Sequence, residues 1–373
     1  MVFFISSFLV AFLATLLIVR SASSHAHLSG DTDKDQPQKF HARVVPRIGG
    51  VGIVVGVLAG AMLMMQKQAE GWLFMTGLVA CGLIAFSAGL IEDFTKRVTP
   101  RQRLLATVVA AAMAAWLLDA VIPKTGIPGL DDLLLIAGVP VALTLLAVAG
   151  VANSVNIIDG FNGLASMCVA IMLAAVAYVA FQVGDTTIMN CALITLGAVL
   201  GFFVWNYPLG LIFLGDGGAY FLGFWVAELG ILLVCRNEAV SPIFPLLLCA
   251  YPIFETLFTM YRRRVIRGRP VGLPDATHLH SLIYRRLMRW AVGKRDASNM
   301  LRRNSMTSPY LWVLCSLSVC PAVLWWDDGS TLSIMLLVFC ASYVALYRAI
   351  VRFRTPRVLL RKAEHWAAPV VEH

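Results

Sequence analysis

The sequence predicts an all-α membrane protein that crosses the bilayer several times. Of its 373 residues, 59% are hydrophobic and only 14% are charged, and the mean hydropathy is +0.78. Soluble domains carry about 25% charged residues, so a soluble fold is excluded. The net charge of +9 is concentrated in short segments between apolar runs, which is typical of membrane topology and not of a nucleic-acid-binding surface.

Apolar stretches of about 20 residues, the length that crosses the hydrocarbon core, recur along the chain. We expect eleven spans, over residues 2–19, 48–65, 72–91, 104–122, 132–152, 163–183, 187–206, 217–234, 242–260, 309–326 and 331–349. The first of these has no basic start and no small-residue cleavage site, so we interpret it as a span and not as a removed signal peptide. The cysteines have no Cys-x-x-Cys spacing and predict neither a disulfide framework nor a zinc site.

Lysine and arginine residues gather on one side of this predicted topology. The segments 20–47, 92–103, 261–308 and the tail from residue 348 hold 27 of the 30 basic residues, whereas the opposite side holds only Lys67, Lys124 and Arg236. The positive-inside rule places the basic side in the cytoplasm, with the N-terminus outside and the C-terminus inside. We therefore expect one integral-membrane domain over residues 1–350 and a basic cytoplasmic tail over 351–373.

Four polar clusters fall on the predicted cytoplasmic side. They are Glu92-Asp93, the stretch 153–164 with its three asparagines and Asp159, the Gly215-Asp216-Gly217-Gly218 run, and the pair His278 and His280. Each has an ordinary explanation: a solvated helix end, a tight turn, a helix N-cap and loop histidines. The histidines are two positions apart, so on a helix their rings would point apart. Their joint occurrence on one face favours a shared functional site over four separate ordinary explanations.

The residue types in these clusters suit phosphoryl transfer. Carboxylate oxygens are ligands for Mg²⁺, which is usually bound by one or two carboxylates together with phosphate oxygens of the substrate. Glycine-rich turns allow backbone N–H groups to approach phosphate, and arginine or lysine neutralises the charge that develops. The sequence therefore predicts Mg²⁺-dependent phosphoryl transfer at the bilayer surface, between a soluble nucleotide and a lipid phosphate.

The order of the motifs resembles one known superfamily. Pro46-Arg-Ile-Gly-Gly50, the acidic pair at 92–93, Asn153-x-x-Asn156-x-x-Asp159-Gly-x-x-Gly163-Leu164, Gly215-Asp216-x-Gly218 and His278-x-His280 are similar to the motifs of the polyprenyl-phosphate N-acetylhexosamine-1-phosphate transferases, glycosyltransferase family 4. The resemblance runs from about residue 40 to 285. It includes the enzymes that initiate O-antigen and enterobacterial common antigen synthesis.

This resemblance implies a reaction and a set of partners. UDP-N-acetylhexosamine, with GlcNAc as the expected sugar, and undecaprenyl phosphate would give undecaprenyl-diphosphate-sugar and UMP. The expected cofactor is Mg²⁺, for which Mn²⁺ could substitute, and the expected location is the bacterial inner membrane with the site facing the cytoplasm. The product would enter lipopolysaccharide, exopolysaccharide or cell-wall synthesis. The bilayer is a partner, no nucleic acid is expected, and a homodimer is compatible with the pattern.

The resemblance also implies residue roles. The site would be formed by the cytoplasmic loops 20–47, 92–103, 153–162, 207–216 and 261–308. Asp216 and Asp93 would hold the metal, and Asp93, with Glu92, would lie by the lipid phosphate as base or positioning group. Asn156 and Asp159 would line the cleft and His278 would contact the diphosphate. Further substrate contacts are expected from Arg47, Lys96, Arg101, Arg103, Asn153, Gly160, Asn162, Gly163, Phe213 and His280, among which Gly160, Gly163 and Phe213 would hold uracil.

The chain departs from the commonest family pattern at four positions. Glu92 replaces an aspartate, Asn162 replaces an aspartate and removes a charge near the expected uracil pocket, Ala219 replaces a serine, and Ser281 replaces a histidine. These departures concern which sugar is used more than the chemistry.

Three other functions remain as alternatives: the peptidoglycan translocase of the same superfamily, a membrane transporter and a catalytically silent assembly protein. Glu228 and Glu255, which lie within predicted spans, are the candidates that a transporter would use. Glu255 is close enough to the basic stretch to belong to the enzyme site.

Overall fold

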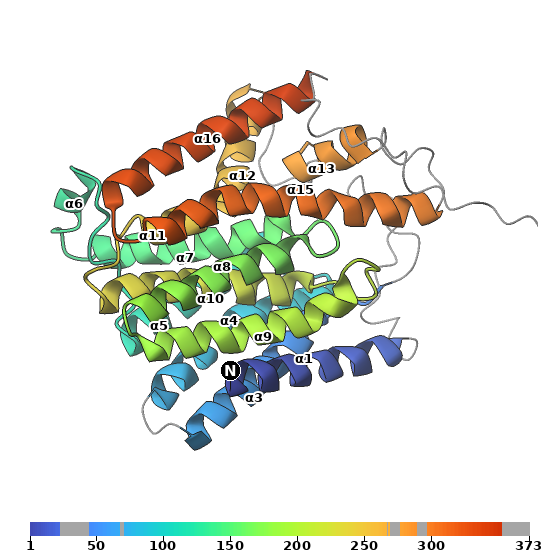
Figure 1. The fold of residues 1–373 in the computed structure, drawn as a ribbon, viewed down its shortest axis with the longest axis horizontal. Helices are drawn as coiled ribbons and strands as arrows, with labels where there is room; N and C mark the ends of the chain where they lie inside the picture. The colour runs from blue at the N-terminus through green and yellow to red at the C-terminus, as the bar shows by residue number, and fades with distance from the viewer. Residues whose placement is uncertain (23–44, 68–70, 267, 269–276, 289–296, 353–373) are drawn as a thin grey trace, which may run out of the picture.

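The computed structural model describes residues 1–22, 45–67, 71–266, 268, 277–288 and 297–352. It therefore leaves out most of the expected 20–47 loop, part of the 261–308 loop and all but the first two residues of the 351–373 tail. The described part is helical and contains no strand. Its long helices lie side by side as a bundle in Figure 1, with α1 along one edge and α16 along the opposite one.

Among the described residues, nine helices are long and apolar enough to cross a membrane. They are α1 (Val2–Arg20), α3 (Gly49–Lys67), α4 (Trp72–Thr95), α7 (Val139–Ile158), α8 (Leu164–Gln182), α9 (Thr186–Asn206), α10 (Gly215–Arg236), α15 (Ala297–Leu324) and α16 (Gly329–Val351). In α15 the crossing stretch is Asn299–Leu324. The multi-pass helical architecture is thus confirmed.

The other two expected spans are helical but do not meet this length and hydropathy criterion. The stretch 104–122 is α5 (Pro100–Leu117), which starts in a capping box of Thr99 and Gln102 and carries Arg101 and Arg103 in its first turn. The stretch 242–260 is divided at Cys249 into α11 (Phe244–Leu248) and α12 (Ala250–Tyr261). The short elements are α6 (Leu130–Leu133), α13 (Leu279–Leu282) and the π-helical turns η1 (Arg262–Ile266) and η2 (Ile283–Met288).

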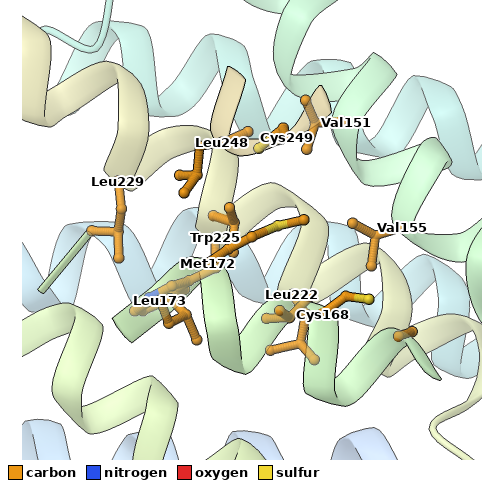
Figure 2. Close-up of a cluster of buried hydrophobic side chains, with 14 of the residues drawn as sticks. Val151, Val155, Cys168, Met172, Leu173, Leu222, Trp225, Leu229, Leu248 and Cys249 are labelled. Carbon is orange, nitrogen blue, oxygen red and sulfur yellow. The ribbon is translucent and has the colours of Figure 1, made fainter. Parts of the chain in front are cut away.

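Helix α10 is the centre of the bundle. It packs against α3, α4, α5, α7, α8, α9 and α11, and its crossing stretch is 94% buried. Figure 2 shows one part of this core, where Leu222, Trp225 and Leu229 of α10 meet side chains of α7, α8 and α11. Glu228 is also fully buried, and neither of its carboxylate oxygens has a hydrogen-bond partner within the described structure.

Several helices extend beyond the apolar runs that predict them. α7 continues to Ile158, so Asn153 and Asn156 lie on a helix and not in the expected 153–162 loop. α10 begins at Gly215, and α15 begins twelve positions before the expected span. The hydropathy pattern misses these turns because their polar side chains have partners on neighbouring helices, described below, and so are stable inside the bundle.

Candidate active site

The candidate site is built where α4 ends and α10 begins. The buried Asp93 carboxylate accepts hydrogen bonds from the backbone N–H groups of Asp216 (3.0 Å) and Gly217 (2.9 Å). These groups belong to the first turn of α10, whose N–H groups have no partner within the helix. Asp93 therefore fixes α4 to the N-terminus of α10, where a carboxylate is also favoured by the helix dipole.

Glycines bring these helices close together. A Cβ atom at Gly89 of α4 would lie 2.5 Å from the Gly217 nitrogen, and one at Gly50 of α3 would lie 2.5 Å from the Gly218 Cα. Gly215 has a left-handed backbone, with φ +77°, a conformation that favours glycine. The glycines of the Gly-Asp-Gly-Gly run therefore permit the packing that positions Asp93 and Asp216.

The motif Pro46–Gly50 has a backbone role in this packing. Phe213 N donates to Pro46 O (2.9 Å), Gly49 N donates to Phe213 O (2.9 Å) and Gly50 N donates to Leu214 O (2.9 Å). The start of α3 is thereby tied to the segment that enters α10. Phe213, expected in the uracil pocket, is half-buried at this junction.

The Asp216 carboxylate lies at the meeting point of three helices. It accepts a hydrogen bond from Asn156 Nδ2 of α7 (2.8 Å) and forms an ion pair with Arg103 of α5. The Arg103 guanidinium also lies 5.7 Å from the centroid of the Tyr220 ring, and Tyr220 donates its hydroxyl hydrogen to Asn153 Oδ1 (3.2 Å). The structure thus brings together four of the expected site residues: Asn153, Asn156, Arg103 and Asp216.

Asp159 ends α7 and begins the connection to α8, which spans residues 159–163. The residue is half-buried. Burial raises the pKa of Asp159 to about 7, and the positive charge of Arg47 opposes this rise. Arg47 and Lys96 also interact electrostatically with Asp93. Both basic residues therefore lie in reach of the acidic cluster, as expected.

Asn162 lies in a buried network and is only 1% exposed. Its backbone N–H donates to Asn304 Oδ1 (2.8 Å), its Nδ2 donates to Pro208 O (3.1 Å), and its carbonyl accepts from Ser308 Oγ (2.6 Å). Within the described residues its Oδ1 has no partner. Asn162 thus joins the 159–163 connection to α15 and to the segment after α9.

The glycine backbones of this connection are also occupied. Gly163 N donates to Asn206 Oδ1 (2.7 Å), Gly163 O accepts from Trp312 Nε1 (3.0 Å), and Gly160 N donates to Ile158 O (2.8 Å). These backbone groups already form hydrogen bonds that fix the conformation of the connection. Uracil in the expected pocket would therefore have to be bound by aromatic rings and not by these N–H groups. Gly163 has φ +71°, and a Cβ there would lie 2.9 Å from both Phe203 and Tyr207.

The two histidines lie together, contrary to the expectation from their spacing. His278 precedes α13 with an extended backbone, and His280 is in the first turn of that helix. Their rings stack with centroids 5.1 Å apart and planes 14° apart. The argument from spacing holds only for two residues of one helix, and His278 lies outside α13. A Cβ at Gly160 would lie 3.3 Å from His280 Nε2, so the pair borders the 159–163 connection.

Glu255 of α12 holds His278 in place. Its Oε1 lies 3.0 Å from His278 Nδ1 and accepts from Leu279 N (3.1 Å), and its Oε2 accepts from the Tyr343 hydroxyl of α16 (2.5 Å). Glu255 is fully buried. The structure therefore assigns Glu255 to the site, which its distance from the basic stretch had suggested. Tyr343 gives no signal in the sequence, because it is one aromatic residue in an apolar helix.

Two expected residues face away from the cluster. Glu92 Oε2 accepts from Val98 N (2.7 Å) and closes the turn between α4 and α5. Arg101 is exposed at the start of α5. Lys96, which ends α4 with φ +56°, is exposed too but interacts electrostatically with Asp93. Glu92 and Asp93, adjacent in sequence, therefore have different partners.

The acidic pair fits the ligand chemistry of Mg²⁺ only in part. No three His, Cys, Asp or Glu side chains are grouped to hold a metal ion in the described ranges. The Asp216 oxygens have side-chain partners, Asn156 and Arg103, and the side chain is partly exposed, whereas both Asp93 oxygens accept backbone N–H groups. Such a site suits an ion that takes one or two carboxylates and completes its shell with phosphate oxygens and water.

The chain is similar to known proteins over a region that contains much of this site. Residues 75–234, which include Asp93, Asp159 and Asp216, match glycosyl transferase family 4. A Bacillus subtilis protein named as a probable undecaprenyl-phosphate N-acetylglucosaminyl 1-phosphate transferase is 28% identical over 297 residues, which are 79% of this chain and 80% of the relative.

Two further relatives represent the two branches of the superfamily. The undecaprenyl-phosphate alpha-N-acetylglucosaminyl 1-phosphate transferase of Escherichia coli K12 is 26% identical, over 74% of each chain. The phospho-N-acetylmuramoyl-pentapeptide-transferase of Geobacillus sp. WCH70 is 29% identical, over 54% of this chain and 66% of the relative.

The fold is that of a multi-pass helical membrane protein, and the family match and the names of the relatives support a phospho-sugar transferase enzyme. These matches make the chain similar to the polyprenyl-phosphate N-acetylhexosamine-1-phosphate transferases, the superfamily that its motifs resemble.

Proposed function

We propose that the protein transfers N-acetylhexosamine 1-phosphate, with GlcNAc as the sugar, from a UDP-sugar to undecaprenyl phosphate and releases UMP. The site faces the cytoplasm of a bacterial inner membrane, and the reaction is the first membrane step of a cell-surface polysaccharide such as O-antigen or exopolysaccharide. The names of the relatives support the reaction. The excess of basic residues on this side of the predicted topology supports the cytoplasmic orientation of the site.

The observation that carries the proposal is the arrangement around Asp216. Its carboxylate is held by Asn156 and Arg103 at the N-terminus of α10, and Asp93 binds the N–H groups of that same turn. A helix N-terminus together with arginine favours phosphate oxygens. A carboxylate at the same point favours a divalent cation between it and the phosphates.

In the proposed reaction, an oxygen of the lipid phosphate attacks the phosphorus that carries the sugar. A new P–O bond forms, the bond between the two donor phosphates breaks, and UMP leaves with the bridging oxygen. A phosphate monoester has a second pKa of about 6, so the lipid phosphate is mostly a dianion at neutral pH and needs no base. We therefore assign Asp93 to positioning.

The protein's other charged groups would neutralise and orient the phosphates. Asp216 would hold Mg²⁺, which when bound neutralises the diphosphate. Arg103, Arg47 and Lys96 supply positive charge near the acids. His278, oriented by Glu255 through Nδ1, would contact the diphosphate with its other ring nitrogen.

A second candidate is the transfer of phospho-N-acetylmuramoyl-pentapeptide. It is favoured by relatives with that name, but these match a smaller part of the chain than the GlcNAc-type relatives do. The substitution of Ser281 in the histidine motif also favours the GlcNAc branch. A transporter is less well supported, because the motif acids meet at one end of the bundle.

A panel of UDP-sugars tests the proposal. Purified protein is incubated with undecaprenyl phosphate, Mg²⁺ and either UDP-GlcNAc, another UDP-N-acetylhexosamine or UDP-N-acetylmuramoyl-pentapeptide, and UMP release is measured. We expect release with UDP-GlcNAc. Release with the pentapeptide donor alone would assign the protein to the other branch, and no release with any donor would contradict the proposal.

A further inference from the structure

Arg303 lies in the first turns of α15, beside the 159–163 connection. The adjacent Asn304 accepts from Asn162 N (2.8 Å), and Ser308, one turn later, donates to Asn162 O (2.6 Å). The same helix packs against α13, which begins at the histidine pair, and against η2. In Figure 1, α13 lies next to α15. Arg303 therefore belongs to the wall between the 159–163 connection and the histidine segment.

The Arg303 side chain is buried, yet two of its three guanidinium nitrogens have no partner in the part of the chain that the structure describes. The residue is 3% exposed, and among the residues that the structure describes neither Nε nor Nη2 has a hydrogen-bond partner. A guanidinium cannot lose its proton in proteins, so burial cannot be relieved by neutralisation. A buried cation without an anion destabilises a folded protein.

Other arginines at this end of the bundle are paired. Arg103 forms an ion pair with Asp216. Arg262 donates to the Thr277 carbonyl and to the Tyr347 hydroxyl. Arg303 differs from both, and it also differs from its neighbour Arg302, which is exposed to solvent. Arg262 is also buried, at 4% exposed, so what distinguishes Arg303 is not burial but the two guanidinium nitrogens that have no partner within the described residues.

We propose that Arg303 binds a phosphate group of a substrate, which supplies the anionic partner that the described residues do not give it. A guanidinium presents a planar set of donors that matches phosphate and can bind it through two parallel hydrogen bonds. The inference rests on the proposed function, which supplies two phosphate sources: the diphosphate of the nucleotide-sugar and the phosphate of the lipid acceptor.

The proposal has a consequence that an ordinary structural arginine would not share. Replacing Arg303 with methionine removes the buried charge and keeps an unbranched apolar chain, so the ligand-free protein becomes more stable. The same change removes a phosphate contact, so substrate binding becomes weaker. A residue that only supports the fold would lower stability when it is replaced.

The test compares Arg303→Met with Arg302→Met, which removes the same charge from the exposed neighbour. Thermal unfolding is followed without ligand, with UDP and with undecaprenyl phosphate, and the KM of each substrate is measured from UMP release. For Arg303→Met we expect a higher midpoint without ligand, a smaller ligand-induced shift and a KM raised about tenfold or more for one substrate. Arg302→Met should change neither KM beyond about twofold. Arg303→Lys keeps the charge without the planar donors, so its ligand-induced shift and its KM should lie between those of wild type and Arg303→Met.

The affected substrate identifies the phosphate source, because loss of the UDP shift indicates the donor and loss of the lipid-phosphate shift indicates the acceptor. Unchanged shifts and KM values in Arg303→Met would overturn the inference. If this variant does not fold, the same result in Arg303→Lys overturns it. The unfolding measurements need no turnover. If the protein releases no UMP but UDP still shifts its unfolding midpoint in a way that depends on Arg303, the proposed function is contradicted and the role of Arg303 is not.

Discussion

Asp93 and Asp216 lie on different helices and are joined by the Asp93 side chain and the Asp216 backbone, not by a contact between their two carboxylates. The Asp93 carboxylate binds the N–H groups of Asp216 and Gly217, while the Asp216 carboxylate remains on the side of Asn156 and Arg103. Asp93 therefore positions the turn that carries Asp216. This division of roles between the two acids underlies the first prediction.

Asp93→Asn is expected to lower turnover strongly and to leave UDP-sugar binding measurable. The amide can accept only one of the two backbone N–H groups, and its NH₂ group faces the other, which costs about 1–3 kcal/mol. Glu92→Gln is the matched control, because the amide oxygen can still accept from Val98 N. UMP release and UDP-induced thermal shifts measure both effects. Loss of nucleotide binding in Asp93→Asn would refute the positioning role.

Gly89→Ala should displace α4 from α10. The new Cβ would lie 2.5 Å from Gly217 N, and such overpacking costs about 1–3 kcal/mol. Gly150→Ala, in the interior of α7, is the control because no atom lies within 4 Å of its Cβ position. Alanine there should be neutral or stabilising by up to about 1 kcal/mol. Equal unfolding midpoints and equal turnover for the two variants would show that the close α4–α10 contact is not needed.

Glu255→Leu should reduce kcat by more than tenfold with little change in donor KM. The variant leaves His278 Nδ1, Leu279 N and the Tyr343 hydroxyl without their common acceptor. Glu255→Gln retains one acceptor oxygen and should recover part of the activity. Steady-state kinetics of UMP release measure kcat and KM for both variants. Circular dichroism and unfolding midpoints identify a general folding defect, which would lower the active fraction of the protein instead of kcat at an intact site.

Asp159 should make the folded protein less stable as the pH rises. Burial raises the pKa of this carboxyl to about 7, above the unfolded value of about 4. Between these two values the folded state holds a proton that the unfolded state has released, so stability falls from pH 4 towards pH 7 and then levels off. Asp159→Asn should reduce this slope in thermal unfolding scans. A slope identical to that of wild type would show that Asp159 titrates normally.

The sequence predicts the helical membrane fold and the positions of the motif acids well. Long apolar runs determine most helix positions, and the site residues Asp93, Asn156 and Asp216 are found together. Helix ends are less predictable. α7 extends through Asn153 and Asn156 because Tyr220 and Asp216 satisfy their side chains, and this tertiary contact has no local signal.

Residue roles were harder to predict than residue positions. Asn162 was expected near uracil because of its motif, but its hydrogen bonds go to Asn304, Pro208 and Ser308, two of which lie about 140 positions later in the chain. Because Glu92 and Asp93 are adjacent in sequence, the motif predicts one shared role for them, yet the two side chains have different partners. The backbone direction at His278, which lets it stack on His280, also depends on Glu255 of another helix.

The central claim is that this helix junction transfers a sugar phosphate to a lipid. It is tested most directly by UMP release from UDP-GlcNAc with and without undecaprenyl phosphate, in wild type and in Asp216→Asn, at a fixed Mg²⁺ concentration. We predict release that requires the lipid phosphate and falls at least about 100-fold in the variant. Release that is independent of the lipid, or equal in the two proteins, would contradict the claim.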